Sequence, residues 1–137
     1  MTTIELIGAP TDIGASVRGA GLGPDALRVA GLPQALSNRR LHVIDRGNLA
    51  GPPNPWEPPQ DGLRHLPEVV AWNRAIHDAV GGALSAGRLP MLLGGDHCLA
   101  VGSISAVARH CRLAGKSLRV LWFDAHADAN TPRMSPS

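Results

Sequence analysis

The sequence feature that most constrains this chain is an apolar run that ends in alternating acidic and imidazole side chains. Residues 120–123 are all apolar, and Asp124, His126 and Asp128 follow them at every second position. A short, continuous apolar run of this kind indicates a strand buried in a parallel sheet. Ligands of open α/β sheets bind just beyond the carboxyl ends of such strands. The feature therefore predicts an α/β fold with a site at residues 124–128.

The spacing of these three side chains indicates a metal ion. In a straight strand the outer two would lie ~13 Å apart, at ~3.3 Å per residue, so the segment must curl to bring them together. The small Ala125, Ala127 and Ala129 leave room for such a curl. Carboxylate oxygen combined with imidazole suits Mn²⁺ or a similar divalent cation, whereas thiolate-rich sites suit Zn²⁺. A solvated acidic loop with an incidental histidine is the alternative interpretation.

Hydrophobic periodicity predicts the rest of the secondary structure. Four short apolar runs predict the strands of the sheet, at residues 4–7, 41–44, 90–93 and 118–123. Apolar residues at steps of three and four predict two long helices, at residues 67–86 and 99–113. A shorter helix is expected around Pro24, and Gly31 and Pro33 interrupt it. The prolines between residues 51 and 59 predict an extended surface loop.

The composition indicates one cytoplasmic domain without nucleic-acid or membrane partners. The 137 residues carry a formal net charge of +2, and the basic side chains are scattered rather than clustered as nucleic-acid binding requires. No apolar stretch approaches the ~20 residues of a membrane span, and the N-terminus lacks the basic and apolar regions of a signal peptide. Cys98 and Cys111 fit no paired motif, so they are expected to be buried free thiols in a reducing compartment.

A second motif follows the strand predicted at residues 90–93. Residues 94–97 read Gly-Gly-Asp-His, and the two glycines allow the backbone to turn sharply. Parallel strands end at the same edge of a sheet, so His97 is expected near the motif at residues 124–128. Residues 8–23 form a glycine-rich loop after the first strand, which is either a flexible rim of the site or a plain connection.

The two motifs together resemble the arginase branch of the ureohydrolases. Residues 124–132 read Asp-Ala-His-Ala-Asp-Ala-Asn-Thr-Pro, and the similarity includes residues 7–10 and 18–24 of the first loop. The resemblance implies a three-layer α/β fold with a parallel sheet, of which residues 1–137 are an incomplete N-terminal half with four strands. It places the first three strands in the order 2-1-3, and the fourth beyond strands from later in the family's domain.

The resemblance implies a binuclear Mn²⁺ site, with two ions per complete site, that hydrolyses L-arginine to L-ornithine and urea. His97 matches a ligand of one metal, Asp124 matches the carboxylate that bridges both, and His126 matches a ligand of the second. Asp128 matches a ligand of the first metal that also hydrogen-bonds the nucleophile, so it is the expected catalytic side chain. Asp96 is expected not to bind a metal itself but to orient the side chains that do.

The resemblance also implies how the substrate is bound. Asn130 and Ser137 match positions that contact the amino-acid end of the substrate. Residues 130–132 favour L-arginine over agmatine, which lacks the α-carboxylate, although agmatine or another guanidino compound stays open. A zinc deacetylase of the related fold is disfavoured, because the two motifs together suit two metals.

Several parts of the family's site are expected beyond Ser137. They are a Gly-Asn-x-His-Gly segment with a proton-shuttling histidine, a further Asp-x-Asp pair of metal ligands, and a glutamate that contacts the guanidinium. A non-catalytic remnant or interaction module is therefore the main alternative to arginase chemistry. Because the fourth strand would have bare edges, the chain alone is expected to be unstable, aggregation-prone, or dependent on a homo-oligomer or a complementing chain.

Overall fold

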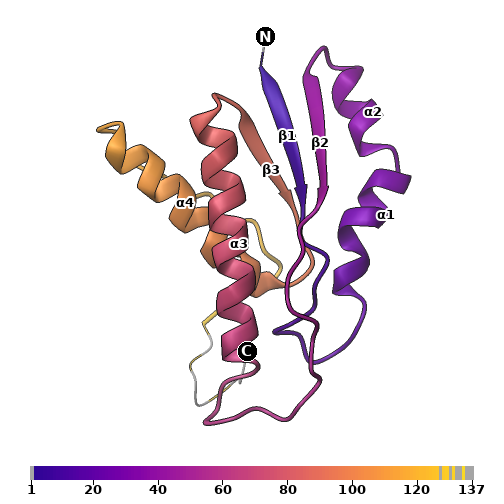
Figure 1. Ribbon diagram of the computed structural model, residues 1–137, viewed down its shortest axis with the longest axis vertical. Helices are drawn as coiled ribbons and strands as arrows, with labels where there is room; N and C mark the ends of the chain where they lie inside the picture. The colour runs from indigo at the N-terminus through magenta and orange to yellow at the C-terminus, as the bar shows by residue number, and fades with distance from the viewer. Residues whose placement is uncertain (1, 127, 130, 132–133, 135–137) are drawn as a thin grey trace.

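The computed structural model describes residues 2–126, 128–129, 131 and 134, and it contains one sheet with helices on both faces (Figure 1). The strands are β1 (Thr3–Gly8), β2 (His42–Asn48) and β3 (Leu89–Leu93). The helices are α1 (Gly23–Val29), α2 (Leu32–Ser37), α3 (Leu66–Ser85) and α4 (Ala100–Leu113), with short 3₁₀ helices η1 (Ala20–Leu22) and η2 (His97–Leu99). No helix within these residues is long and apolar enough to cross a membrane.

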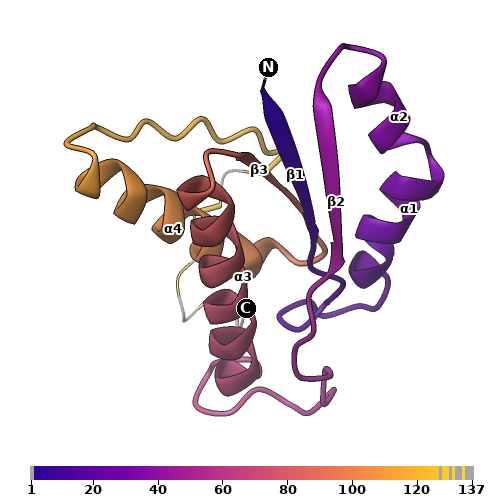
Figure 2. The same ribbon diagram turned by 45° about the horizontal axis from the view of Figure 1, so that its top comes forward.

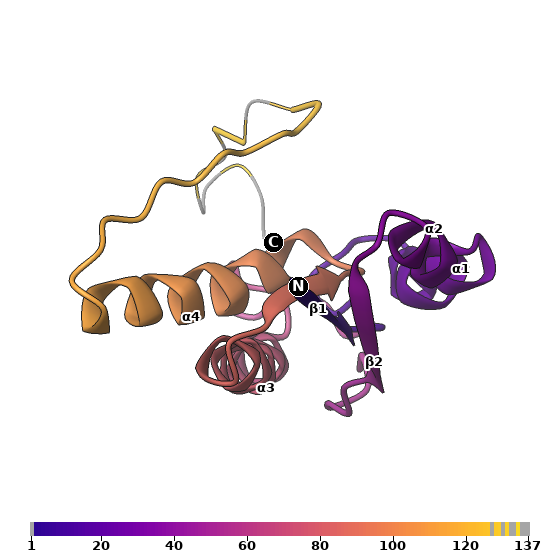
Figure 3. The ribbon, with the colours of Figure 1, turned by 90° about the horizontal axis from the view of Figure 1, so that it is seen from above.

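The sheet is parallel, and β1 lies between β2 and β3. Alternate side chains of β1 point to opposite faces. Leu6 packs with Leu32 and Leu36 of α2, whereas Ile7 belongs to the core formed with α3 and α4. Figure 3 shows these two helix layers on opposite sides of the strands. The expected three-layer parallel α/β fold and the strand order 2-1-3 are confirmed.

Most predicted elements form where the sequence pattern placed them. The strands predicted at residues 4–7 and 90–93 and the two long helices are present within a few residues of the predicted bounds. β2 continues to Asn48, beyond the predicted residue 44, because its pairing with β1 resumes at Gly8 after a register shift. Residues 51–59 contain neither helix nor strand, as their prolines predicted.

The prediction of a strand at residues 118–123 is wrong. This segment has no regular secondary structure, and its Leu121 and Phe123 side chains are 72% and 92% exposed. Figures 2 and 3 show it as an irregular trace that leaves α4 and stays outside the sheet. Among the described residues no strand pairs with it, and a lone extended segment has no hydrogen-bond ladder to hold it. Within the part of the chain that the structure describes, the sheet therefore has three strands rather than four.

Candidate metal centre

His97 begins η2, directly after the glycine turn that leaves β3. Asp96 caps this turn, because its carboxylate accepts a hydrogen bond from the Cys98 N–H at 3.4 Å. The backbone N–H of Asp96 donates to the carbonyl of Thr11 at 3.1 Å. A Cβ on Gly95 would collide with that same carbonyl, so glycine lets the turn pack closely against the loop after β1. This packing places His97 at the carboxyl edge of the sheet.

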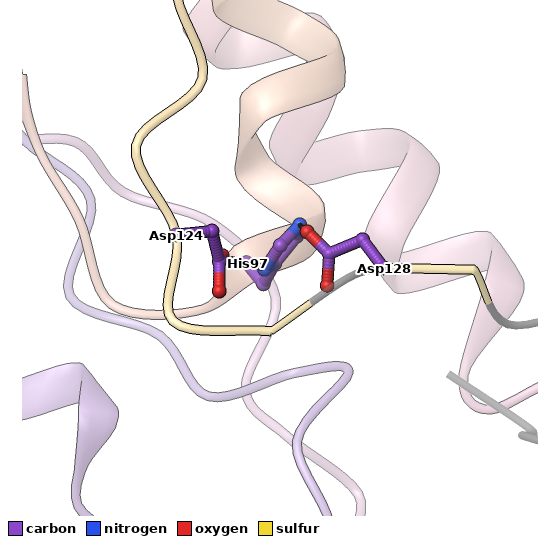
Figure 4. Close-up of side chains that lie close together, drawn as sticks. All are labelled: His97, Asp124 and Asp128. Atoms are coloured by element: carbon purple, nitrogen blue, oxygen red, sulfur yellow. Dashed lines mark ion pairs between the residues drawn. The ribbon is translucent and has the colours of Figure 1, made fainter.

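The His97 ring lies between two carboxylates from the segment after α4 (Figure 4). Its Nδ1 is 3.6 Å from Asp124 Oδ2, and its Nε2 is 3.5 Å from Asp128 Oδ2. The backbone bends at residues 125–126, and Asp128 has a φ of 50°. The curl predicted from the spacing is therefore present. One ligand atom from each of the three side chains lies within 4.8 Å of the others.

His126, the remaining predicted ligand, lies outside this group of three. Its Nδ1 is 3.3 Å from Asp124 Oδ1, and its side chain is 85% exposed. The backbone N–H of His126 donates to the same oxygen at 2.8 Å. The two oxygens of Asp124 consequently face different imidazoles, with Oδ2 toward His97 and Oδ1 toward His126.

Trp122 belongs to the site although the sequence pattern did not indicate it. Its indole N–H donates to Asp128 Oδ2 at 3.0 Å, and its ring centroid lies 5.2 Å from that of His97. The apolar run placed Trp122 inside a buried strand, whereas it is 49% exposed here. The sequence offered one sign of this contact. Trp122 lies close to the acidic motif, and the indole N–H of a tryptophan near polar groups usually finds an acceptor.

Hydrogen bonds, burial and neighbouring charges shift the pKa of two groups near the site. The His126 backbone N–H lowers the pKa of the Asp124 carboxyl group, and the His126 and His97 side chains act in the same direction. Burial, followed by the charge of Asp96, raises the pKa of the Cys98 thiol to about 12. Cys98 therefore stays protonated near neutral pH, and the chemistry of this site is that of oxygen and nitrogen donors.

The donor set fits Mn²⁺ or a similar divalent cation. Two carboxylates and an imidazole match the ligand preference of such ions, and a cation offsets the negative charge that His97, Asp124 and Asp128 carry together. Their spacing within 4.8 Å is close to the ~4.2 Å between ligands on opposite sides of an octahedral ion at ~2.1 Å. The two predicted substrate contacts, Asn130 and Ser137, lie outside the described residues.

Comparison with known proteins identifies one family for this whole arrangement. The model of the arginase family matches residues 2–137. The arginase of Staphylococcus aureus (strain COL) is 39% identical over 137 residues, which cover 98% of this chain and 44% of that protein. The arginase of Bacillus caldovelox is 37% identical over 139 residues, covering 100% of this chain and 45% of that protein. The chain thus spans less than half the length of the curated relatives it matches.

Solved arginase structures share the fold. The Bacillus caldovelox arginase superposes with a TM-score of 0.87 at 37% sequence identity, covering 100% of this chain and 45% of that one. The Bacillus subtilis arginase gives a TM-score of 0.82 at 34% identity, covering 99% of this chain and 42% of that one. The strand order and the helix layers described above are therefore those of the corresponding part of these structures.

Proposed function

The chain belongs to the arginase family, and we propose that it contributes part of a binuclear Mn²⁺ site for the hydrolysis of L-arginine to L-ornithine and urea. The relatives matched here are named arginases, and the residues brought together at the carboxyl edge of the sheet suit a divalent metal. The chemistry proposed is therefore the hydrolysis of a linear amidine, carried out with help from residues beyond the part of the relatives that this chain spans.

The position of Asp124 is the observation that best supports this proposal. A carboxylate shared by two metals would be well placed with one oxygen directed to each, and the two oxygens of Asp124 face separate imidazoles. We assign His97 to the first metal and His126 to the second, with Asp124 between them. The hydrogen bond from the His126 backbone N–H lowers the pKa of Asp124 below its ordinary value, which favours the charged carboxylate that a cation binds.

Asp128 is proposed to bind the first metal together with His97 and to hold the attacking nucleophile. Its Oδ2 contacts both the His97 ring at 3.5 Å and the Trp122 N–H at 3.0 Å, so its orientation is fixed from two sides. The other carboxylate oxygen is free of these two contacts. It is the atom we expect to accept a hydrogen bond from the nucleophile and to keep it directed at the guanidinium carbon.

The guanidinium group explains why metals are needed. Its charge is delocalised, so its carbon is a weak electrophile that requires a strong nucleophile. When bound, two divalent ions lower the pKa of a water molecule and make such a nucleophile available near neutral pH. The side chains of this chain would hold the ions and orient the nucleophile. The substrate would approach at the carboxyl edge of the sheet.

L-arginine is the proposed substrate, and Asn130 and Ser137 are proposed to contact its amino-acid end. Both positions match the family's contacts for that group, while agmatine lacks the α-carboxylate they would bind. We also propose a cytoplasmic location, in keeping with two free cysteines in the chain. Residues 118–123 have exposed apolar side chains, and we propose that a homo-oligomer or a complementing chain covers them.

A non-catalytic role is the second candidate, and one observation favours it. The three clustered ligands are all exposed, and the segment that carries two of them is held by no strand pairing among the described residues. Such a site suits weak metal binding better than hydrolysis, since catalysis needs ligands held rigidly in place. The chain would then act as a metal-binding or interaction module of arginase ancestry.

Urea release from L-arginine with added Mn²⁺ tests the proposal. With those helping residues present, in the same chain or in a complementing one, we expect urea to be formed by the unchanged protein, to be lost in Asp128→Asn, and to be retained in Asp78→Asn, which removes the same charge from a side chain that is 84% exposed on α3. Agmatine in place of L-arginine should give little urea. Mn²⁺ binding without urea release from either compound would support the non-catalytic role instead.

A further inference from the structure

We propose that His65 is a positioning residue for the metal centre, acting through the loop after β1 on the turn that carries His97. This inference rests on the proposed function, because that function is what requires a metal centre here. His65 lies near the middle of the sequence, before both site motifs, and directly precedes α3, where it is 7% exposed. A buried histidine of this kind needs partners for both ring nitrogens.

His65 joins two loops through those ring nitrogens. Its Nδ1 lies 2.7 Å from the carbonyl oxygen of Ile13, in the loop after β1. Its Nε2 lies 3.1 Å from the Glu57 backbone N–H nitrogen and 3.0 Å from the Glu57 carbonyl oxygen, in the proline-rich loop. Because the carbonyl oxygen of Ile13 can only accept, Nδ1 must carry the hydrogen, and Nε2 of the neutral ring accepts from the Glu57 N–H.

Capping of α3 does not account for this histidine. His65 occupies the N-cap position, but its side chain makes no cap hydrogen bond there. Its backbone has a φ of 45°, in the left-handed region that favours glycine, so a histidine is held at a position where its conformation is unfavourable. What the imidazole ring contributes is therefore its contacts with the two loops and not a cap of α3.

The loop held by His65 is in turn fastened to the turn that carries His97. The N–H of Gly14, next to Ile13, donates to the carboxylate of Asp96. The N–H of Asp96 donates to the carbonyl of Thr11 at 3.1 Å. Hydrogen bonds therefore connect the two segments on both sides of Ile13, and Asp96 immediately precedes His97 in the chain.

Side-chain packing provides a second connection along the same path. Ile13 is fully buried and shares a hydrophobic cluster with Leu99, the last residue of η2, which is 1% exposed. A shift of the Ile13 backbone would therefore move the Asp96 contacts and the packing under η2 together. Interiors are close-packed, so such a shift is transmitted rather than absorbed. His65 is placed to prevent it, because it fixes the Ile13 carbonyl.

Two substitutions separate this role from a general effect on folding. His65→Asn leaves an amide nitrogen near the place of Nδ1 and can still donate to Ile13. His65→Gln reaches toward Glu57 instead and gives up the Ile13 bond. His42→Gln, at an exposed position on β2, is the matched control. Hydrogen exchange of the Gly14 and Asp96 amides reports the loop-to-turn contacts, and Mn²⁺ binding followed by EPR reports the site itself.

We expect His65→Gln to speed exchange of both amides and to weaken Mn²⁺ binding about tenfold, as loss of an outer support of a metal site does. His65→Asn and the control should stay within about twofold of the unchanged protein. Equal effects of the Asn and Gln variants, or unchanged exchange at Gly14 in His65→Gln, would overturn the proposal.

A measurement on the unchanged protein covers the case in which a variant fails to fold. Ring nitrogen chemical shifts should show a hydrogen on Nδ1 of His65, and an unprotonated Nδ1 would overturn the proposal. The proposed function fails separately, if the unchanged protein binds no Mn²⁺ at all. In that case the exchange of the Gly14 and Asp96 amides still decides whether His65 positions the turn.

Discussion

Glu5 is a buried carboxylate in the middle of the sheet, and we expect Glu5→Gln to destabilise the fold. The Glu5 side chain is 2% exposed, and it accepts hydrogen bonds from Arg46 at 2.9 Å and from Arg88 at 2.7 Å. Arg46 belongs to β2, and Arg88 immediately precedes β3, so a single carboxylate on β1 links all three strands. Glutamine keeps the size of this side chain but removes the charge that both arginines bind.

The exposure of the two arginines limits the size of the effect. Two charge-assisted hydrogen bonds to a buried group contribute about 3–6 kcal/mol when both partners are buried. Arg46 and Arg88 are 50% and 39% exposed, so water screens the pairs and solvates the arginines again when the charge is lost. We therefore expect a loss of about 2 kcal/mol, which lowers the urea midpoint by about 1 M at a slope of about 2 kcal/mol per M.

The pH dependence of this effect identifies its cause. The hydrogen bond from Arg88, helped by Arg46, lowers the pKa of Glu5 below its ordinary value of 4.5. The stabilisation is thus complete above pH 4.5 and is lost as the pH falls through the lower value of the folded state. Urea midpoints of the unchanged protein and of Glu5→Gln should converge in acid, while Asp78→Asn changes the midpoint by less than about 0.2 M. A Glu5→Gln midpoint within about 0.2 M of the unchanged protein at pH 7 would refute the reasoning.

Three further predictions concern other parts of the chain. Cys98 should react with iodoacetamide at pH 8 much more slowly in the folded protein than in urea, since its pKa is raised to about 12; equal rates would contradict this. Amides of residues 118–123 should exchange within seconds, and strong protection would mean that they form a strand. Gly95→Ala should lower stability by about 1–3 kcal/mol in urea unfolding, because its Cβ would meet the Thr11 carbonyl; an unchanged midpoint would disprove that contact.

Sequence patterns correctly predicted the helices and strands that depend mainly on the residues within them. The apolar run at residues 4–7 became the central strand, and the steps of three and four at residues 67–86 became α3. The run at residues 118–123 has the same character, yet it forms no strand. Apolar side chains favour burial, but a strand needs a neighbour to pair with, and sequence pattern carries no information about which segment that neighbour is.

The same distinction holds for the site. The spacing of Asp124 and Asp128 and the turn before His97 are each local features, and the expectation that both lie at one edge of the sheet indicated that these side chains would meet. Contacts that no motif marks could not be predicted in this way. The indole of Trp122 is such a case, and so is the carbonyl of Ile13, which His65 binds across 52 residues of sequence.

Mn²⁺ binding to the Asp124→Asn protein tests most directly whether one carboxylate serves two metals. We would follow the free ion by EPR in a titration of the unchanged protein, Asp124→Asn, His126→Asn and Asp78→Asn. A bridging Asp124 predicts that Asp124→Asn weakens binding of both ions, that His126→Asn weakens only one, and that Asp78→Asn changes neither. Unchanged binding of both ions in Asp124→Asn would contradict the proposed binuclear site.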